Sequence, residues 1–160
     1  MGLVLPPIEA YQVQHLPLVK AYADKIGLVE VINQVVPTEM DVDPGTIVLG
    51  MILDTLSGRS PLYRLEEFFT HQDTALLLGK AVAPEVCNDD TVGRILERLY
   101  DVGTMQIFTA CVVRAEQVYG LDKRSVHFAT TSIRVSGDYL PPEGQPGEQE
   151  RAGPFTITHG

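Results

Sequence analysis

The sequence predicts a mainly α-helical region over residues 1–122, followed by a β-hairpin within residues 123–160. Through most of the first region, apolar residues recur at the spacing of an amphipathic helix. Residues 125–135 are instead rich in β-branched side chains and alternate as a half-buried strand does. Residues 137–154 contain eight Pro or Gly residues, which predicts a flexible loop, and residues 155–158 again favour a strand.

Cap and turn residues divide the first region into seven expected helices. Gly27 separates the first two, and Pro37 stops the second because proline cannot continue a helix. Asp43 before Pro44 is an acidic N-cap with proline at the first helical position. The expected helices span 16–26, 28–36, 44–56, 62–69 and 73–78, followed by one that Asn88 caps and one over 104–119 that Gly120 ends.

Three of these helices are expected to build the core. The helix over 44–56 is apolar nearly all round, which is typical of the buried centre of a helical bundle. The last two carry apolar stripes and meet at Gly103, so we expect them to pack as an antiparallel hairpin. The stripes are Val92, Ile95, Leu96, Leu99 and Tyr100 in the first helix, and Ile107, Phe108, Cys111, Val112, Ala115, Val118 and Tyr119 in the second.

The charge of the chain argues against nucleic-acid binding by these residues. Twelve Lys and Arg residues face 21 Asp and Glu residues, and the net charge of −9 is spread over all three thirds of the sequence. Phosphate contacts supply much of the affinity of a DNA-binding protein, and they need a basic face. The sequence shows no such face.

The cysteines and the apolar segments favour a cytoplasmic protein with no membrane partner. Cys87 and Cys111 lie far apart without the spacing of metal ligands, which indicates a reducing compartment. The N-terminus lacks a basic stretch followed by a long apolar one, so secretory targeting is not expected. The longest apolar cluster, residues 46–56, is interrupted by Gly50 and Asp54 and is too short to span a bilayer.

Few residues show the pattern of a catalytic or metal site. Asn88-Asp89-Asp90 could hold a metal ion, but a helix cap with acids at the positive end of the helix dipole is the favoured interpretation. Cys111 lies in an apolar stripe and is interpreted as a core residue, not a nucleophile. Arg59 and Arg64 form a local basic spot, interpreted as solvated surface. Four scattered histidines have no carboxylate or cysteine at ligand spacing: His15, His71, His127 and His159.

One segment near the C-terminus resembles a known family. The run Val126-His127-Phe128-Ala129-Thr130-Thr131-Ser132 resembles the first core strand of DDE-type insertion-sequence transposases, which in one branch reads His-Leu-Asp-Thr-Thr-Ser. Four further segments are similar to that family in the same order along the chain: 26–32, 61–69, 88–100 and 157–160. The chain therefore resembles the N-terminal portion of such a transposase over nearly its whole length.

The resemblance implies a fold, a reaction and partners. The fold would be a helical N-terminal domain, 1–122, followed at 123–160 by the truncated start of a ribonuclease-H-like catalytic domain, with its first β-hairpin. The family cleaves and joins DNA strands at transposon ends, and intact members use Mg²⁺ held by carboxylates. The implied partners are a full-length transposase or a second copy of this chain. Transposon-end DNA is expected to bind weakly if at all, because the chain is acidic.

The chain departs from the family at the catalytic positions. Ala129 stands where the family has the first aspartate of its catalytic triad, and a methyl group cannot coordinate Mg²⁺. The other two acidic positions of the family lie beyond residue 160. We therefore expect no catalytic residue, no metal ligand and no cofactor site here, and we interpret the chain as an N-terminal fragment or decayed copy of a transposase that is itself inactive.

A second interpretation stays open, in which the chain is a stand-alone helical protein-interaction module unrelated to transposition. Ala129 is then an ordinary strand alanine. An independent module should fold without residues 137–160, whereas a truncated catalytic core should expose an unpaired strand edge there.

Overall fold

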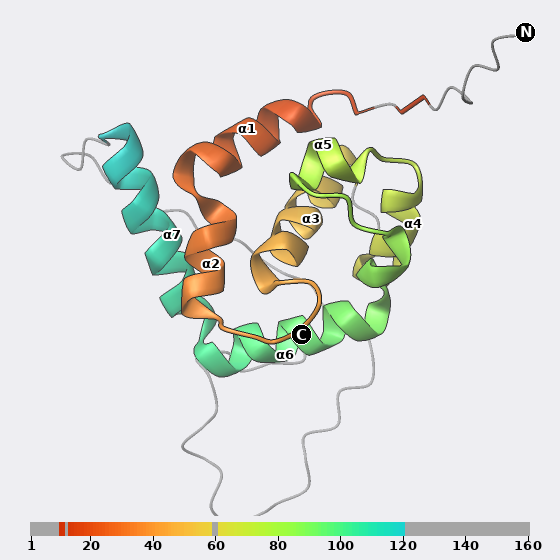
Figure 1. The fold of residues 1–160 in the computed structure, drawn as a ribbon. Helices are drawn as coiled ribbons and strands as arrows, with labels where there is room; N and C mark the ends of the chain where they lie inside the picture. Colours follow the sequence, from red (N-terminus) through yellow and green to blue (C-terminus); the bar gives the residue numbers. More distant parts are fainter. Residues whose placement is uncertain (1–9, 12, 59–60, 121–160) are drawn as a thin grey trace, which may run out of the picture. The chain divides into compact units, whose positions relative to one another are not determined.

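The computed structural model describes residues 10–11, 13–58 and 61–120 (Figure 1). The chain divides into two units after Lys123, and every described residue belongs to the first unit. Within the described ranges the α-helices are α1 (Leu16–Ile26), α2 (Leu28–Val35), α3 (Pro44–Ser57), α4 (Leu65–Thr70), α5 (Thr74–Leu78), α6 (Asp89–Val102) and α7 (Thr104–Tyr119), and the 3-10 helices are η1 (Leu62–Arg64) and η2 (Pro84–Cys87).

The helices expected from the sequence are confirmed, each close to its expected ends. The segment expected as one helix over 62–69 is the 3-10 turn η1 followed by α4. The short helix η2 was not expected, and it begins at Pro84, where proline suits a first helical position. In the described part of the chain, no helix is both long enough and apolar enough to cross a bilayer.

The expected fold class, however, is wrong. The described residues form helices and turns and contain no β-strand, so the structure is all-helical and shows no β-hairpin of a ribonuclease-H-like core. Period-two alternation over a few residues is a weak signal, because short apolar runs do not distinguish strands from other structure. The segments for which strands and a loop were expected, 125–135, 137–154 and 155–158, lie outside the described residues, as does the expected domain boundary after residue 122.

Local side chains and one glycine set where the helices begin and end. Gly27 adopts φ 66° and ends α1 in the left-handed conformation that glycine tolerates best, and α2 begins at the next residue. The carboxylate of Asp73 accepts a hydrogen bond from Leu76 N at 2.9 Å and caps α5. Asn88 caps α6 in the same way, since its Oδ1 accepts from Thr91 N at 2.9 Å.

Helix α3 is the centre of the fold, as its all-round apolar pattern predicts. Figure 1 shows it enclosed by α1 and α2 on one side, α4 and α5 on the other, and α6 below. Leu49 and Leu53 are fully buried, and Phe69 of α4 and Ile95 of α6 belong to the same core. Burial of each such side chain contributes about 1.5–3 kcal/mol, so this cluster supplies much of the stability.

The closest approach of two helices brings α2 against the first turn of α3. A Cβ atom added at Gly45 would lie 2.4 Å from the carbonyl oxygen of Val29 and 2.9 Å from Asn33 Oδ1. No side chain fits into that space. Glycine at this position therefore lets α2 and α3 pack backbone to backbone.

The expected antiparallel pairing of the last two helices is not what the structure has. Figure 1 shows α7 turning away from α6 at a steep angle, and α7 packs against α1 and α2. Gly103, at φ 98° and ψ 116°, makes the corner. Consequently Ile107 is buried, whereas Phe108 and Val112 of the predicted stripe are 66% and 37% exposed.

Candidate functional site

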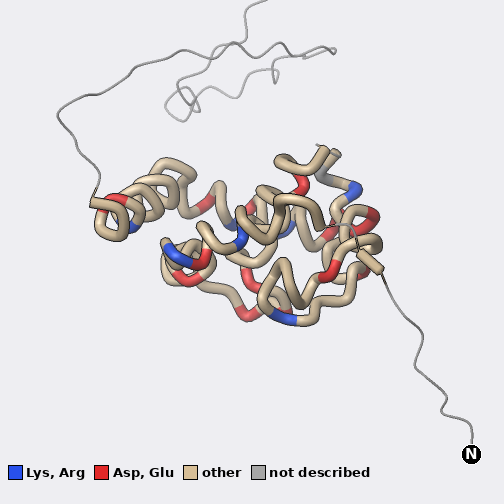
Figure 2. The backbone as a smooth tube through the Cα atoms, turned by 90° about the horizontal axis from the view of Figure 1, so that it is seen from above, with Lys and Arg blue, Asp and Glu red and all other residues tan. Residues whose placement is uncertain are grey.

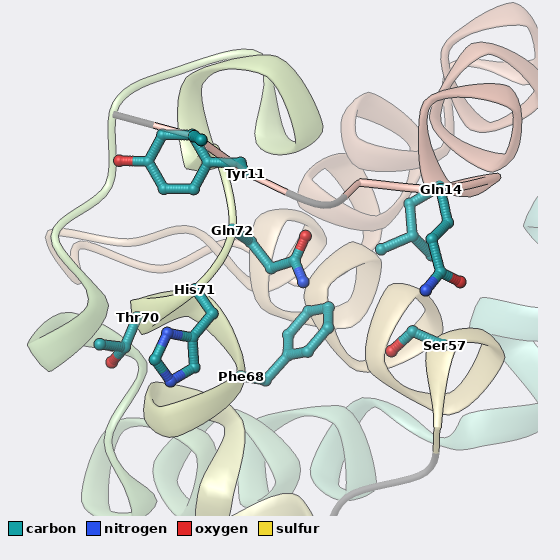
Figure 3. A pocket seen from close by; sticks show the side chains of 9 residues that line it. Tyr11, Gln14, Ser57, Phe68, Thr70, His71 and Gln72 are labelled. Carbon is teal, nitrogen blue, oxygen red and sulfur yellow. The ribbon is translucent and has the colours of Figure 1, made fainter. Parts of the chain in front are cut away.

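A cavity of about 510 Å³ opens between the segment before α1, the C-terminal end of α3 and the C-terminal end of α4 (Figure 3). Its size is within the range of small-molecule sites, roughly 300–1,000 Å³. The residues that line it are Ala10, Tyr11, Gln14, Leu16, Ser57, Phe68, Thr70, His71 and Gln72. His71 is the one titratable side chain other than Tyr11 in this lining, so the cavity lacks a carboxylate to pair with a histidine in acid–base chemistry.

Two hydroxyl groups of the cavity hydrogen-bond to carbonyl groups of their own helices. The Ser57 hydroxyl donates to the carbonyl oxygen of Asp54 at 3.1 Å, and the Thr70 hydroxyl donates to that of Glu66 at 3.0 Å. Gln72 Oε1 is buried without a hydrogen-bond partner, but it has almost no accessible surface. A molecule in the cavity therefore cannot reach it without a rearrangement, and the cavity is better explained by packing than by recognition.

A polar cluster at the start of α3 serves the fold. Asp43 Oδ1 accepts hydrogen bonds from Thr46 N and from Asn33 Nδ2, both at 2.8 Å, while Oδ2 accepts from the Thr46 hydroxyl at 2.9 Å and from Lys80 Nζ. Burial alone would raise the pKa of Asp43, but the hydrogen bonds from Lys80, Asn33 and Thr46 outweigh it and lower the pKa to about 2. Asp43 therefore stays ionised and ties α2, α3 and the segment after α5 together.

One side of α7 exposes a row of apolar side chains. Met105 and Phe108 are 74% and 66% exposed, and Val112 and Tyr119 are each 37% exposed. With the half-buried Ala115 between the last two, these residues follow one another in alternate steps of three and four, so they share one side of the helix. We call Met105, Phe108, Val112, Ala115 and Tyr119 the outer face of α7.

A second stripe of α7 packs inward. Ile107, Cys111 and Val118 form a stripe that adjoins the outer face along the helix, and they are buried or half-buried. At the C-terminal end the outer face meets α1, where the Tyr119 ring lies 6.4 Å from that of Tyr22 and 4.6 Å from Lys25 Nζ. The remaining outer face, toward the N-terminal end of α7, has no such cover in the structure described.

Figure 2 shows Lys and Arg scattered among Asp and Glu along the described helices, without a basic cluster. The local basic spot expected at Arg59 and Arg64 does not stand apart, since Arg64 Nη1 lies 3.8 Å from a Glu67 carboxylate and Arg59 lies outside the described residues. Residues 102–113, by contrast, contain no Asp, Glu, Lys, Arg or His. The outer face of α7 is therefore uncharged over its exposed part.

The other candidate residues of the sequence have different surroundings. Asn88 is the N-cap of α6, and the backbone N–H of Asp90 donates to the Asp89 carboxylate at 3.0 Å, so a capping role accounts for the acidic pair. His15 Nε2 lies within 3.0 Å of the Leu56 carbonyl oxygen, and His71 lies at the cavity. Ala129, His127 and His159 lie outside the described residues.

The donor set of the described residues does not fit a Mg²⁺ centre of the kind the resemblance implies. Mg²⁺ is bound by carboxylates together with water and phosphate oxygens. No group of three or more His, Cys, Asp or Glu side chains in the described ranges is placed to hold a metal ion. Catalysis by metal-held carboxylates therefore finds no support in this helical part.

Sequence reasoning missed the outer face of α7 and the partners of Asp43. A signal for the first was present, because α7 has more apolar positions than a single buried stripe can use. The sequence pattern could not predict the contact of Lys80 with Asp43, because 37 residues separate them in the chain.

Comparison with known proteins identifies a family. A family model described as "Domain of unknown function (DUF4277)" matches residues 8–113, which include α1 to α6 and most of α7. Neither a curated protein nor a solved structure matches the chain.

Proposed function

The chain belongs to the DUF4277 family, and we propose that it is the helical N-terminal portion of an insertion-sequence transposase, which acts through protein contacts and not through DNA cleavage. The segments that resemble the transposase family carry the first half of this proposal. Within the described residues they fall on structural positions that define the helical fold: the α1–α2 junction, the buried aromatic side of α4, and the capped helix α6.

The outer face of α7 is the observation that carries the second half. Its exposed side chains form an uncharged apolar surface in a chain with a net charge of −9. Contiguous exposed apolar surfaces of a few hundred Å² are often functional, and they mark contacts with other proteins or with ligands. Tight binding to transposon-end DNA is disfavoured, because DNA contact requires basic side chains gathered on one face and the described helices show no such cluster. The proposed partners are a full-length transposase or a second copy of this chain.

We also propose a cytoplasmic location. The two thiols, Cys87 and Cys111, are free, which suits a reducing compartment.

Co-expression with an intact transposase that carries a similar N-terminal region tests the proposal. We expect the chain to lower the transposition frequency at least tenfold by entering mixed assemblies. The matched control is the Ile95→Asp variant, whose core is disrupted and which should leave the frequency unchanged. An unchanged frequency with the unaltered chain, at equal expression, would contradict the proposal.

A cleavage assay tests the proposal that the chain does not cleave DNA. The purified chain should not nick transposon-end DNA in the presence of Mg²⁺ or Mn²⁺. Nicking that chelation abolishes, and that a mock purification does not show, would overturn the non-catalytic role.

A further inference from the structure

We propose that the outer face of α7 binds the same face of a second copy of this chain, in an antiparallel helix pair related by a two-fold axis at Val112. This inference rests on the proposed protein-contact role and names the partner. It concerns the described helices alone and needs no transposase, no DNA and no metal ion.

The spacing of the outer face suits another helix of the same kind. Its five residues alternate in steps of three and four, which is the repeat that lets side chains of one helix insert between those of a neighbour. An aliphatic or aromatic ligand of another shape would gain nothing from that repeat. The occupant is therefore expected to be a helix.

The order of side chains along the face suits a copy of itself. Val112 is at the centre, seven residues from Met105 on one side and from Tyr119 on the other. An antiparallel pair centred on Val112 sets the large Phe108 of each copy beside the small Ala115 of the other. Large against small is the arrangement that fills the space between two helices, and a two-fold axis supplies it twice.

The distribution of charge allows two copies of this acidic chain to pair through α7. Residues 102–113 carry no charged side chain, so the centre of the pair brings no carboxylates together. In the antiparallel register, Arg114 of one copy lies opposite Ala110 of the other, and Glu116 lies opposite Phe108. The surrounding acidic surfaces stay in water, where salt screens them over roughly 10 Å.

The exposed area sets the expected strength. Side chains of this size offer roughly 150–250 Å² each, so the outer face presents on the order of 400 Å² and a pair buries about twice that. Stable interfaces bury about 1,200–2,000 Å², so this pair lies below that range and is a weak, transient association. We therefore expect a dissociation constant on the order of micromolar, tightened when the chain is part of a larger assembly.

Sedimentation of the full chain across a concentration series tests the pairing. The mass should rise from 17.6 kDa toward twice that value as concentration passes through the micromolar range. Phe108→Asp and Val112→Asp should each weaken association at least tenfold without loss of helical content. The matched control is Tyr63→Asp, because Tyr63 is 65% exposed, as Phe108 is 66%, but belongs to η1, which packs against α4 and α6.

Cross-linking tests the position of the axis. In a Cys111→Ala background, Val112→Cys should form an intermolecular disulfide under mild oxidation, because a residue on a two-fold axis meets its own copy. Val113→Cys is the control, since Val113 is similarly exposed at 45% but lies on a different side of α7. Equal cross-linking of the two variants would overturn the proposed register.

A chain that stays monomeric throughout the series, whether or not another part of it covers the outer face, would overturn the pairing itself. The co-expression experiment tests contact with a full-length transposase, so its outcome does not depend on this result.

Discussion

Asn33 and Asp43 are joined by a hydrogen bond of 2.8 Å, in which Asn33 Nδ2 in α2 donates to the carboxylate that caps α3. The same side-chain amide accepts from Gly45 N at 2.8 Å, so a single asparagine satisfies both an acceptor and a donor at the start of α3. Because Gly45 also allows the two backbones to touch, hydrogen bonding and close packing support each other at this point of the fold.

The first prediction concerns the Asp43 cluster. Asp43→Ala should lower the free energy of unfolding by about 2 kcal/mol, because it removes the N-cap of α3 and leaves the half-buried Asn33 amide without its acceptor. Urea denaturation measures the change. The comparison variant is Asp73→Ala, which removes only the cap of the short helix α5 and should cost about 1 kcal/mol or less.

The second prediction concerns pH. The pKa of Asp43 falls from 3.8 to about 2 in the folded chain, so the stabilisation it gives is present above pH 3.8 and is lost as the pH falls toward 2. Between pH 4 and pH 2 the unaltered chain should therefore lose about 1–2 kcal/mol more of its free energy of unfolding than the Asp43→Asn variant does. Acid unfolding monitored by circular dichroism measures the difference. Parallel curves for the two proteins would contradict a stabilising role of the Asp43 carboxylate.

The third prediction compares two glycines in helices. Gly45→Ala should destabilise the chain by about 1–3 kcal/mol, because the new methyl group meets the Val29 carbonyl and the helices must move apart. Gly93→Ala in α6 should instead stabilise it by roughly 0.5–1 kcal/mol, since nothing lies within 4 Å of the added carbon and alanine favours a helix. Thermal melts distinguish the two, and changes of the same sign would contradict the α2–α3 geometry.

The fourth prediction separates a core residue from the outer face. Ile95→Asp should cost about 3 kcal/mol or more, because Ile95 is fully buried and the new carboxylate would have no partner. Val112→Asp should cost less than about 1 kcal/mol, measured at a concentration too low for association. The sequence places both residues in the apolar stripes of an expected antiparallel hairpin, where either carboxylate would be buried. The structure corrects this for Val112, which is partly exposed.

The fifth prediction concerns the thiols. Burial, together with the charge of Glu66, raises the pKa of Cys87 to about 11, and burial raises the pKa of Cys111 as well. Cys87 is also 1% exposed, whereas Cys111 is only half-buried. Iodoacetamide at pH 8 should therefore modify Cys111 well before Cys87 in the native chain and both at similar rates in urea. Mass spectrometry of the digested protein reads the order.

Helix positions could be predicted because their causes are local. Asp43 before Pro44, Gly27 after the first apolar stripe and Asn88 before two acids each act within one turn of the residue that carries them. The central place of α3 was also predictable, since a helix apolar on every side has to be surrounded. The strands expected after residue 120 lie outside the described residues, within which the structure is helical.

The sequence by itself determined the helices, their caps, the buried centre and the absence of a gathered basic face, because each depends on neighbours in the chain or on composition. Only the tertiary structure decided how the helices are used. The corner at Gly103 sends α7 onto α1 and α2, which buries Ile107 and leaves Phe108 exposed. The tertiary structure also brings Lys80, after α5, to Asp43 at the start of α3. Both depend on the direction in which one helix leaves another, and that direction is fixed by packing between residues distant in sequence, which no local pattern records.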